Sequence, residues 1–300
     1  MPWKRRGVRQ WKYAMWIDRS VVEDLDCPDG REELARRATA IAREATGGAD
    51  IEVFWDGVWM RRVGQHFFAD PEMFNVQPNW QRWVGMAEKY LRDANDYWFH
   101  VYKPKPGDVI VDIGAGRGED VFAFSRAVGP TGRVWALEPH PVSFAALTKF
   151  CERNRLQNVV LRNLACVEEP GDLQIETLPV WESNYVRAGA PSATSYPVRG
   201  VRFDSFWKEQ GIGRIDFLKM NIEGAERMAL PGCKEALSCA RFVCIAAHDF
   251  RADRGEGEHF RTLAFVREFL SDAGFDLVTR DDDPRYYVPY HVHGVNRTLG

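Results

Sequence analysis

The residues most suited to chemistry lie in a glycine-rich turn that follows an apolar run. The run is Val109–Ile113, and Asp112 stands near its end. Glycines at alternating positions let backbone N–H groups approach a ligand closely, at the point where a strand gives way to a helix. A dinucleotide-binding turn would carry its third glycine at position 119, which is a glutamate here. The spacing therefore differs from that of the dinucleotide fingerprint, and Asp112, Gly114, Ala115, Gly116, Gly118 and Glu119 are the candidate cofactor-binding residues of this turn.

A carboxylate follows the next predicted strand. Glu138 and Pro139 come directly after the run Arg133–Leu137. The carboxyl ends of parallel strands meet at one edge of a sheet, which is where ligands bind. A carboxylate at this edge can accept hydrogen bonds from both hydroxyls of a ribose. We therefore assign Glu138 and Pro139 to cofactor binding as well.

Two glutamates follow the fourth predicted strand, at the start of a helix predicted over Glu223–Leu230. Residues three apart share one face of a helix, so Glu223 and Glu226 are expected to face the cofactor or the substrate together. Acidic residues in a first helical turn also stabilise the helix dipole, which is the structural alternative for both. Asn221 precedes them and would equally suit a helix N-cap.

His248 follows the fifth predicted strand, Phe242–Ala246. Neighbouring strand ends should bring His248 and Asp249 close to Asn221 and Glu223. A histidine whose pKa is near ~6.5 can take the proton of a hydroxyl group at neutral pH. We therefore predict His248 as a general base or substrate-orienting residue, with Glu223 and Glu226 as its catalytic companions.

The segment from Lys219 to Glu226 closely resembles the K-x-D-x-E-G-x-E hallmark of the FkbM-type methyltransferases, which use S-adenosylmethionine (SAM). The glycine turn after Asp112 resembles the first motif of class I SAM methyltransferases. Val201–Phe206 and Leu230–Gly232 match the segments on either side of the hallmark, and the resemblance extends over residues 108–292. The usual aspartate of the hallmark is Asn221 here, so a carboxylate role does not carry over to this position.

The resemblance implies an α/β fold of class I, with a Rossmann-like sheet that is mainly parallel and ends in an antiparallel hairpin. It implies SAM as the cofactor, with Asn221 near it and the segment around Ala165 and Cys166 lining its adenine. It also implies O-methylation of a hydroxyl on a secondary metabolite, sugar or glycolipid. The acceptor is accordingly expected to be a small molecule or a glycan.

The pattern of apolar residues divides the chain into an N-terminal extension, residues 1–103, and a methyltransferase domain, residues 104–300. The extension is predicted to hold a helix over Arg31–Thr46, a hairpin around Asp56-Gly57 and one long helix over Asn79–Tyr102. In the domain, runs typical of buried strands alternate with helical patterns. The strands are expected at Val109–Ile113, Arg133–Leu137, Val159–Arg162, Asp216–Met220 and Phe242–Ala246, with helices at Asp120–Val128, Pro141–Asn154, Glu223–Leu230 and His259–Ala273, and a final hairpin of Phe275–Thr279 with Tyr286–Val292.

Two loops complete this description. The connection Pro179–Gly200 has no clear periodicity, and long loops at the functional edge of a sheet often shape substrate sites. The loop Arg251–Glu258 is a candidate mobile lid.

Several alternatives stay open at this stage. The acceptor atom could belong to a carboxylate or a nitrogen instead of a hydroxyl. The chain could also be a non-catalytic SAM- or RNA-binding module that uses the basic, aromatic stretch of residues 1–19. A magnesium ion held by Asn221, Glu223 and Asp249 is conceivable but not favoured, because His248 beside them suits magnesium poorly; we predict no metal ligands.

Composition limits the partners. The formal net charge is −3 and there is no run of 18 apolar residues, which disfavours nucleic acid as a partner and argues against a membrane span. The six cysteines contain no C-x-x-C pair and fit reduced thiols, so we expect a cytoplasmic protein. A homodimer is left open.

Overall fold

The computed structural model describes residues 27–74, 79–178, 184–187 and 189–300. The chain forms two compact units, and the division between them falls between Gly85 and Met86. This division lies upstream of the predicted boundary at residue 103. The basic stretch of residues 1–19 lies outside the described residues.

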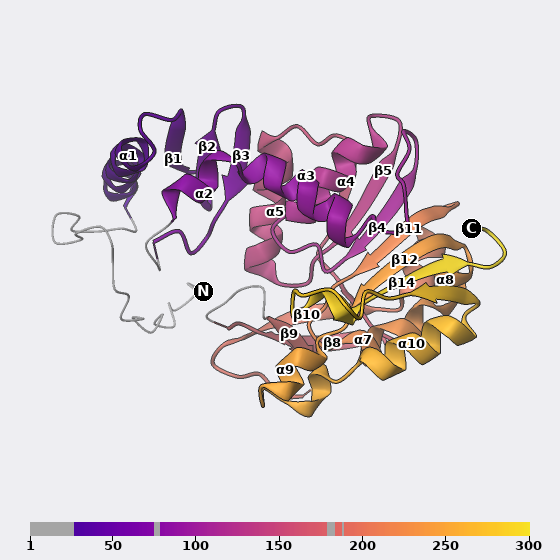
Figure 1. Cartoon of the computed structure of the whole chain (residues 1–300). Coiled ribbons are helices and arrows are strands. Elements are labelled where there is room, and N and C mark those ends of the chain that lie inside the picture. The colour runs from indigo at the N-terminus through magenta and orange to yellow at the C-terminus, as the bar shows by residue number, and fades with distance from the viewer. Residues whose placement is uncertain (1–26, 75–78, 179–183, 188) are drawn as a thin grey trace. The chain divides into compact units, whose positions relative to one another are not determined.

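The first unit contains a helix and a three-stranded antiparallel sheet (Figure 1). Helix α1 covers Pro28–Ala45 and is capped by Cys27, whose Sγ accepts from the Gly30 N–H at 3.2 Å. The predicted hairpin is confirmed as β1 (Ile51–Trp55) paired with β2 (Trp59–Val63). A third strand that we did not predict, β3 (His66–Ala69), pairs with β2, and α2 (Trp80–Val84) follows.

The single helix predicted over Asn79–Tyr102 is wrong. Gly85 ends α2, and a separate helix, α3, runs over Met86–Tyr97. The apolar period continues across Gly85. Glycine, however, loses more conformational entropy in a helix than any other residue, and the helix is interrupted at this position. Periodicity alone could not detect this interruption.

The second unit is built on a seven-stranded sheet in the order β13-β14-β12-β11-β4-β5-β6. Neighbours from β12 to β6 pair in parallel, whereas β14 pairs antiparallel with both β12 and β13. The predicted fold class is therefore confirmed. The strands are β4 (Val109–Ile113), β5 (Arg133–Leu137), β6 (Val159–Arg162), β11 (Ile215–Met220), β12 (Ala240–Ala246), β13 (Phe275–Val278) and β14 (His291–Asn296).

The last strand differs from the prediction at Tyr286–Val292. It begins only at His291, because Val288–Tyr290 form a 3-10 turn around a proline, which cannot donate to a strand ladder. Three strands with parallel neighbours carry almost continuous apolar runs because both faces of the sheet are covered. Successive residues of β4 point to opposite faces of the sheet, so Ile110 packs in one hydrophobic core and Val111 packs in the other.

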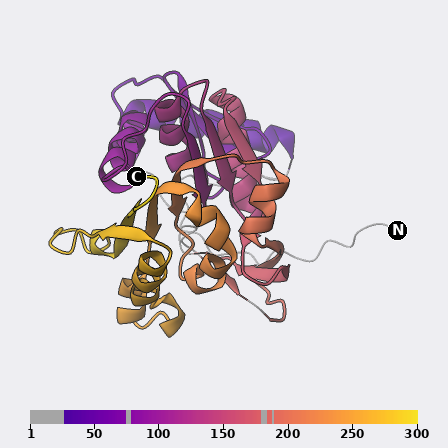
Figure 2. The same cartoon turned by 90° about the vertical axis from the view of Figure 1, so that its right-hand side faces the viewer.

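Helices lie on both faces of this sheet (Figure 2). The predicted helix over His259–Ala273 is divided into a 3-10 turn, Glu258–Phe260, and α10 (Leu263–Asp272). The other helices are α4 (Glu119–Val128), α5 (Pro141–Arg153), α6 (Phe203–Glu209), α7 (Glu226–Ala229), α8 (Lys234–Ser238) and α9 (Asp249–Asp253), with a 3-10 turn at Leu230–Cys233. Among the described residues, none of these helices has the length and apolar character needed to cross a membrane.

The connection predicted as irregular over Pro179–Gly200 contributes two strands, β9 and β10, to a second sheet. Its order is β7-β10-β8-β9, with β10 antiparallel to β8 and β8 antiparallel to β9. The strands are β7 (Ala165–Cys166), β8 (Gly171–Glu176), β9 (Tyr185–Arg187) and β10 (Ser195–Val201). Residues 179–183 and 188 of this region lie outside the described residues.

Candidate active site

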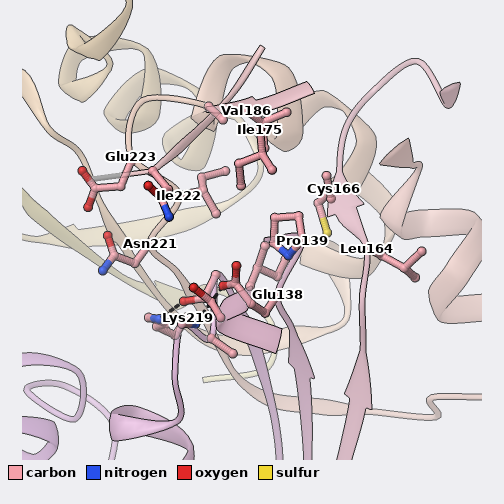
Figure 3. Close-up of a pocket in the computed structure, with 18 of the residues that line it drawn as sticks. Glu138, Pro139, Leu164, Cys166, Ile175, Val186, Lys219, Asn221, Ile222 and Glu223 are labelled. Carbon is pink, nitrogen blue, oxygen red and sulfur yellow. Dashed lines mark hydrogen bonds between the residues drawn. The ribbon is translucent and has the colours of Figure 1, made fainter. Parts of the chain in front are cut away.

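A cavity lies at the carboxyl ends of β4, β5 and β11 (Figure 3). Most of the predicted cofactor residues line it, together with Glu223. Pro139, Leu164 and Cys166 stand on one side of the cavity, and Asn221 and Glu223 stand on the other (Figure 3). The predicted residues in its lining are Gly114, Ala115, Gly116, Glu119, Glu138, Pro139, Ala165, Cys166, Asn221 and Glu223.

The glycine turn is shaped by close backbone contacts. Gly114 has φ +82°, and a Cβ atom there would lie 2.0 Å from the carbonyl oxygen of Asn221. The N–H groups of Gly114 and Ala115 both donate to the Leu137 carbonyl, at 2.9 and 3.0 Å. Gly118 lies at the start of α4, where a Cβ atom would meet the Phe150 ring of α5 at 2.6 Å. The missing side chain of Gly114 thus lets the turn lie against the Asn221 backbone, whereas that of Gly118 lets α4 and α5 pack together.

Glu138 is held in the cavity wall by backbone donors. Its Oε2 accepts from the Gly116 N–H and its Oε1 from the His140 N–H, both at 2.8 Å. Burial raises the pKa of Glu138 to about 7, even though these two hydrogen bonds favour the ionised form. Each carboxylate oxygen has a second lone pair, so Glu138 can still accept two hydroxyl groups from a ligand.

Asp112 does not stand in the cavity wall as predicted; it is fully buried behind Lys219. Lys219 Nζ donates to Asp112 Oδ1 and to the Gly114 carbonyl, each at 2.8 Å, and lies 3.4 Å from Asp120 Oδ2. Burial lowers the pKa of Lys219, but the two carboxylates outweigh this effect and raise it. Asp112 therefore acts on the site by orienting Lys219, which ties β11 to the glycine turn.

Lys219 itself was missed as a site residue. It lines the cavity with only 1% of its side chain exposed. The signal was available, because a lysine in a fully buried strand is rarely tolerated without partners. Asp120 also lines the cavity and was not predicted.

Glu223 does not begin a helix, contrary to the prediction. Its φ is +53°, in the left-handed region, and Gly224 follows with φ +90°. The helix α7 starts only at Glu226, so the two glutamates do not share a helix face. A left-handed conformation costs a residue other than glycine about 1–2 kcal/mol, so contacts elsewhere must hold Glu223 in place.

Two cations provide those contacts. Glu223 Oε2 lies 2.7 Å from Arg251 Nη1, and its Oε1 lies 3.0 Å from His248 Nε2. Burial raises the pKa of Glu223, but the charges and hydrogen bonds of His248 and Arg251 outweigh it and lower the pKa overall. The structure therefore presents an ionised carboxylate at the cavity wall.

His248 is not placed to be the general base that we predicted. It is 5% exposed, and besides Glu223 it faces Glu226, whose Oε1 lies 3.6 Å from Nδ1. Burial lowers the pKa of His248, but the two glutamates outweigh burial and raise it to about 10. The ring is an imidazolium at neutral pH and holds no free lone pair for a substrate proton.

Glu226 and Asp249 support this arrangement from behind. Glu226 is completely buried, and its Oε2 accepts from the Thr262 hydroxyl at 2.9 Å. Asp249 Oδ1 accepts the backbone N–H groups of Thr262 and Leu263, both at 2.8 Å, and so caps the start of α10. Glu226 is thus a partner of His248 and not a group that touches a substrate.

Arg251 belongs to the site although the sequence suggested a mobile lid for Arg251–Glu258. The guanidinium is buried, and it bridges Glu223 to Glu256, whose Oε2 lies 2.7 Å from Nε. The Phe260 ring lies 3.8 Å below it. No spacing rule connects Arg251 with Glu223, so sequence reasoning had no signal for this pair.

Asn221 Oδ1 is buried and makes no hydrogen bond within the described part of the chain. The backbone N–H of the same residue donates to the Ile113 carbonyl at 3.0 Å, which fixes the segment next to Gly114. A buried acceptor at a cavity wall costs free energy unless a ligand supplies a donor. Asn221 is therefore suited to receive an N–H or O–H group from a bound molecule.

A mainly parallel sheet that ends in an antiparallel hairpin, with a ligand cavity at its glycine turn and an acid after its second strand, is typical of the class I methyltransferases. The family described as the FkbM methyltransferase domain matches residues 112–277, which is more than half of the chain. The chain belongs to this family, and it is a methyltransferase that uses SAM. The residues of the cavity fit that cofactor. Glu138 lines the cavity with free lone pairs that would accept the ribose hydroxyls, and the carboxylates in the lining would balance the positive charge of the sulfonium.

Three curated relatives are similar to parts of the chain. The 31-O-demethyl-FK506 methyltransferase FkbM of Streptomyces tacrolimicus is 27% identical over 68% of this chain and 86% of its own length. The 2-O-methyltransferase NoeI of Sinorhizobium fredii is 28% identical over 51% of this chain and 68% of its own length. The hexuronic acid methyltransferase AglP of Haloferax volcanii is 24% identical over 47% of this chain and 56% of its own length.

Proposed function

We propose that this methyltransferase transfers the methyl group of SAM to a hydroxyl of a small molecule or glycan. The ribose of SAM is held by Glu138, its methionine part lies along the turn at Gly114–Gly116, and Ala165 and Cys166 adjoin the adenine. Bound SAM supplies an electrophilic methyl group on a positively charged sulfur. The chain's own residues then have to orient the acceptor oxygen and take its proton.

The observation that carries this proposal is the Glu223 carboxylate, which is ionised and fixed at the cavity wall. It accepts the hydrogen bond of the acceptor hydroxyl and so aligns the oxygen for in-line displacement. As the carbon–oxygen bond forms, the O–H group becomes strongly acidic, so a carboxylate of low pKa is basic enough to take the proton. The bonding electrons of the broken carbon–sulfur bond stay with sulfur, which balances the step.

The charge of the cavity distinguishes the possible acceptors. A carboxylate acceptor would approach the Glu223 carboxylate, and two like charges in one site repel each other. A hydroxyl has no such penalty. The names of two relatives specify O-methylation, which supports a hydroxyl acceptor.

The acceptor is expected to combine hydroxyl groups with an apolar face. Ile175 of β8 and Val186 of β9 are direct cross-strand partners, and both side chains line the cavity near Ile222. This apolar surface suits a sugar ring or the carbon skeleton of a secondary metabolite. One relative is named for a hexuronic acid, which supports a sugar among the candidates; since such a sugar carries both hydroxyls and a carboxylate, that name does not bear on which group is methylated.

The test is a transfer assay with methyl-labelled SAM and three acceptor panels: glycosides and aliphatic alcohols, amines, and carboxylic acids. Label is expected in the hydroxyl panel, and Glu223→Gln should lower kcat by about 10²–10⁴-fold, the usual contribution of a positioned proton acceptor. SAM affinity, measured by calorimetry, should stay unchanged. Glu209→Gln, an exposed acid on α6, is the matched control.

Label confined to amines or carboxylic acids would refute the proposal. So would a Glu223→Gln variant that transfers methyl to hydroxyls at the full rate. Failure of the wild-type protein to bind SAM would remove the assignment of the cofactor residues.

A further inference from the structure

This inference rests on the proposed role of Glu223. We infer that Arg251 is a positioning residue for methyl transfer, because it fixes the Glu223 carboxylate against the acceptor side of the cavity. Arg251 does not line the cavity among the described residues, so it acts only through Glu223.

The guanidinium is built to hold one orientation. Its Nη1 bonds Glu223 at 2.7 Å and its Nε bonds Glu256 at 2.7 Å, so two edges of the same planar group have carboxylate partners. The Phe260 ring below, at 3.8 Å, restricts movement out of that plane. A planar fork with fixed partners positions a carboxylate more tightly than a lysine could.

The segment that carries Glu223 needs such a clamp. It lies between β11 and α7, with left-handed backbone at both Glu223 and Gly224. A Cβ atom on Gly224 would lie 2.8 Å from the Phe260 ring, so the same aromatic residue supports both Arg251 and this turn. Arg251 and Phe260 therefore connect the α9 region to the cavity wall.

The charged groups around Glu223 come from three elements. His248 follows β12, Glu226 begins α7, and Arg251 lies in α9, with Glu256 beyond it. His259 is also in this region, but burial and the charge of Arg251 lower its pKa, so it adds no positive charge at neutral pH. His248 shares its charge between two glutamates and loses its proton in alkaline solution, whereas an arginine stays protonated. Among the cations His248 lowers the pKa of Glu223 most, and Arg251 is the second cation that lowers it, one that stays charged at every pH.

The decisive experiment compares pH profiles of kcat for the full-length wild type and the Arg251→Met variant, which keeps an apolar side chain over Phe260. Loss of a hydrogen bond to a charged group should lower kcat about 10- to 100-fold. Without the neighbouring cation the pKa of Glu223 rises, so the acid limb of the profile should move to higher pH. Arg251→Lys should return the acid limb of the profile to its wild-type pH but recover only part of the lost kcat.

Arg261→Met is the matched control, since Arg261 pairs with exposed acids of the same region, Asp253 and Glu258. It should change neither kcat nor the acid limb. SAM affinity is expected to stay unchanged in every variant. If Arg251→Met does not fold, Glu256→Gln provides the test, because it leaves the charge of Arg251 and removes its anchor; a few-fold loss of kcat with the acid limb in place is expected.

A folded Arg251→Met variant with normal kcat, or with reduced kcat and an unmoved acid limb, would overturn the inference. A Glu256→Gln variant with wild-type kcat would also count against it. These results differ from failure of the proposed function, in which the wild type does not methylate hydroxyls or Glu223→Gln keeps its rate.

Discussion

The two sides of the cavity are held in place by different kinds of chemical group. On the cofactor side, the turn at Gly114–Gly116 and the Glu138 carboxylate are held by backbone N–H groups at the ends of β4 and β5. On the acceptor side, Glu223 is held by the charged side chains of His248 and Arg251, which come from the end of β12 and from α9. The first side depends mainly on the path of the main chain, with the buried Lys219–Asp112 pair behind its turn, whereas the second depends on ion pairs that involve the carboxylate at the cavity wall itself.

This difference has consequences for what each side tolerates. Backbone donors persist whatever the pH, so the shape of the glycine turn is sensitive mainly to added atoms, whereas the Glu138 carboxylate that it holds still titrates. Buried ion pairs lose their stabilising effect when one partner is removed or neutralised, because the remaining charge has no partner. The acceptor side should therefore respond to charge changes that do not alter its shape.

The largest effect is expected from His248→Gln. Removing one member of a buried ion pair costs about 3 kcal/mol in the free energy of unfolding, since Glu223 and Glu226 lose a shared cation. The folded-state pKa of His248, about 10, lies above the ordinary value of 6.5. The stabilisation is therefore fully present below pH 6.5 and is lost as the pH rises through about 10.

Denaturant titrations of wild type and variant at pH 6, 8 and 10 measure this difference. His293→Gln is the control, because burial lowers the pKa of His293 to about 3 and leaves its ring neutral throughout that range. Its effect on stability should be the same at pH 8 and pH 10 and smaller at pH 6, because below about pH 6.5 the unfolded histidine binds a proton that the buried ring does not, which weakens only the wild type. A His248→Gln deficit that does not shrink towards pH 10 would mean that the acceptor side is not held by charge.

Gly114→Ala tests the opposite property of the cofactor side. The new Cβ would lie 2.0 Å from the Asn221 carbonyl oxygen, on backbone with φ +82°. The turn must move, and we expect SAM affinity to fall roughly 100-fold, or about 2.7 kcal/mol, by calorimetry. Gly213→Ala is the matched control, since a Cβ atom there would meet nothing within 4 Å. Normal SAM binding by Gly114→Ala would show that the turn is not the binding element.

The same contrast explains how much the sequence could predict. The central sheet, the glycine turn and Glu138 were predictable because the signals are local: apolar runs, glycine spacing and an acid at a strand end. His248 and Glu223 were identified as site residues for a similar reason, since they follow adjacent strands. The conformations around them were not predictable, because the left-handed backbone of Glu223 depends on partners distant in the chain.

The acceptor side therefore produced the differences in chemical role at His248 and Glu226, whereas on the cofactor side Asp112 and Gly118 were assigned to the cavity wall and lie behind it. A histidine at a strand end has the same local sequence whether it is a free base or an imidazolium between two glutamates. Arg251 gave no signal because its partner Glu223 is 28 positions away along the chain. The second sheet was missed because β7 and β9 are short, and because β9 and β10 follow β8 through segments without clear alternation.

Glu138→Gln should have a smaller effect than Gly114→Ala, but one that depends on pH. Burial holds the pKa of Glu138 at about 7, and the ionised form is the one that accepts both ribose hydroxyls. Wild-type affinity for SAM should be constant above pH 7 and fall up to about tenfold per pH unit below it. The variant should bind about tenfold more weakly at pH 8, with little dependence on pH. A wild-type affinity that rises on acidification would contradict the ribose assignment.

The smallest effect is expected from Asn221→Asp, which locates the boundary between the two sides. Asn221 Oδ1 is a buried acceptor at the cavity wall without a hydrogen-bond partner in the described structure. If it faces the sulfonium, an added negative charge should favour SAM over the neutral thioether S-adenosylhomocysteine. A charge pair at about 4 Å contributes about 1 kcal/mol in a hydrated site, which corresponds to a change of about fivefold in the affinity ratio. Calorimetry with both ligands measures that ratio, and kcat with a hydroxyl acceptor is measured on the same protein.

A raised ratio places Asn221 on the cofactor side. An unchanged ratio with altered kcat places it beside Glu223, where a second carboxylate would compete for the acceptor hydroxyl. A lowered ratio would contradict both assignments, because no position near the sulfonium lets added negative charge favour the neutral ligand.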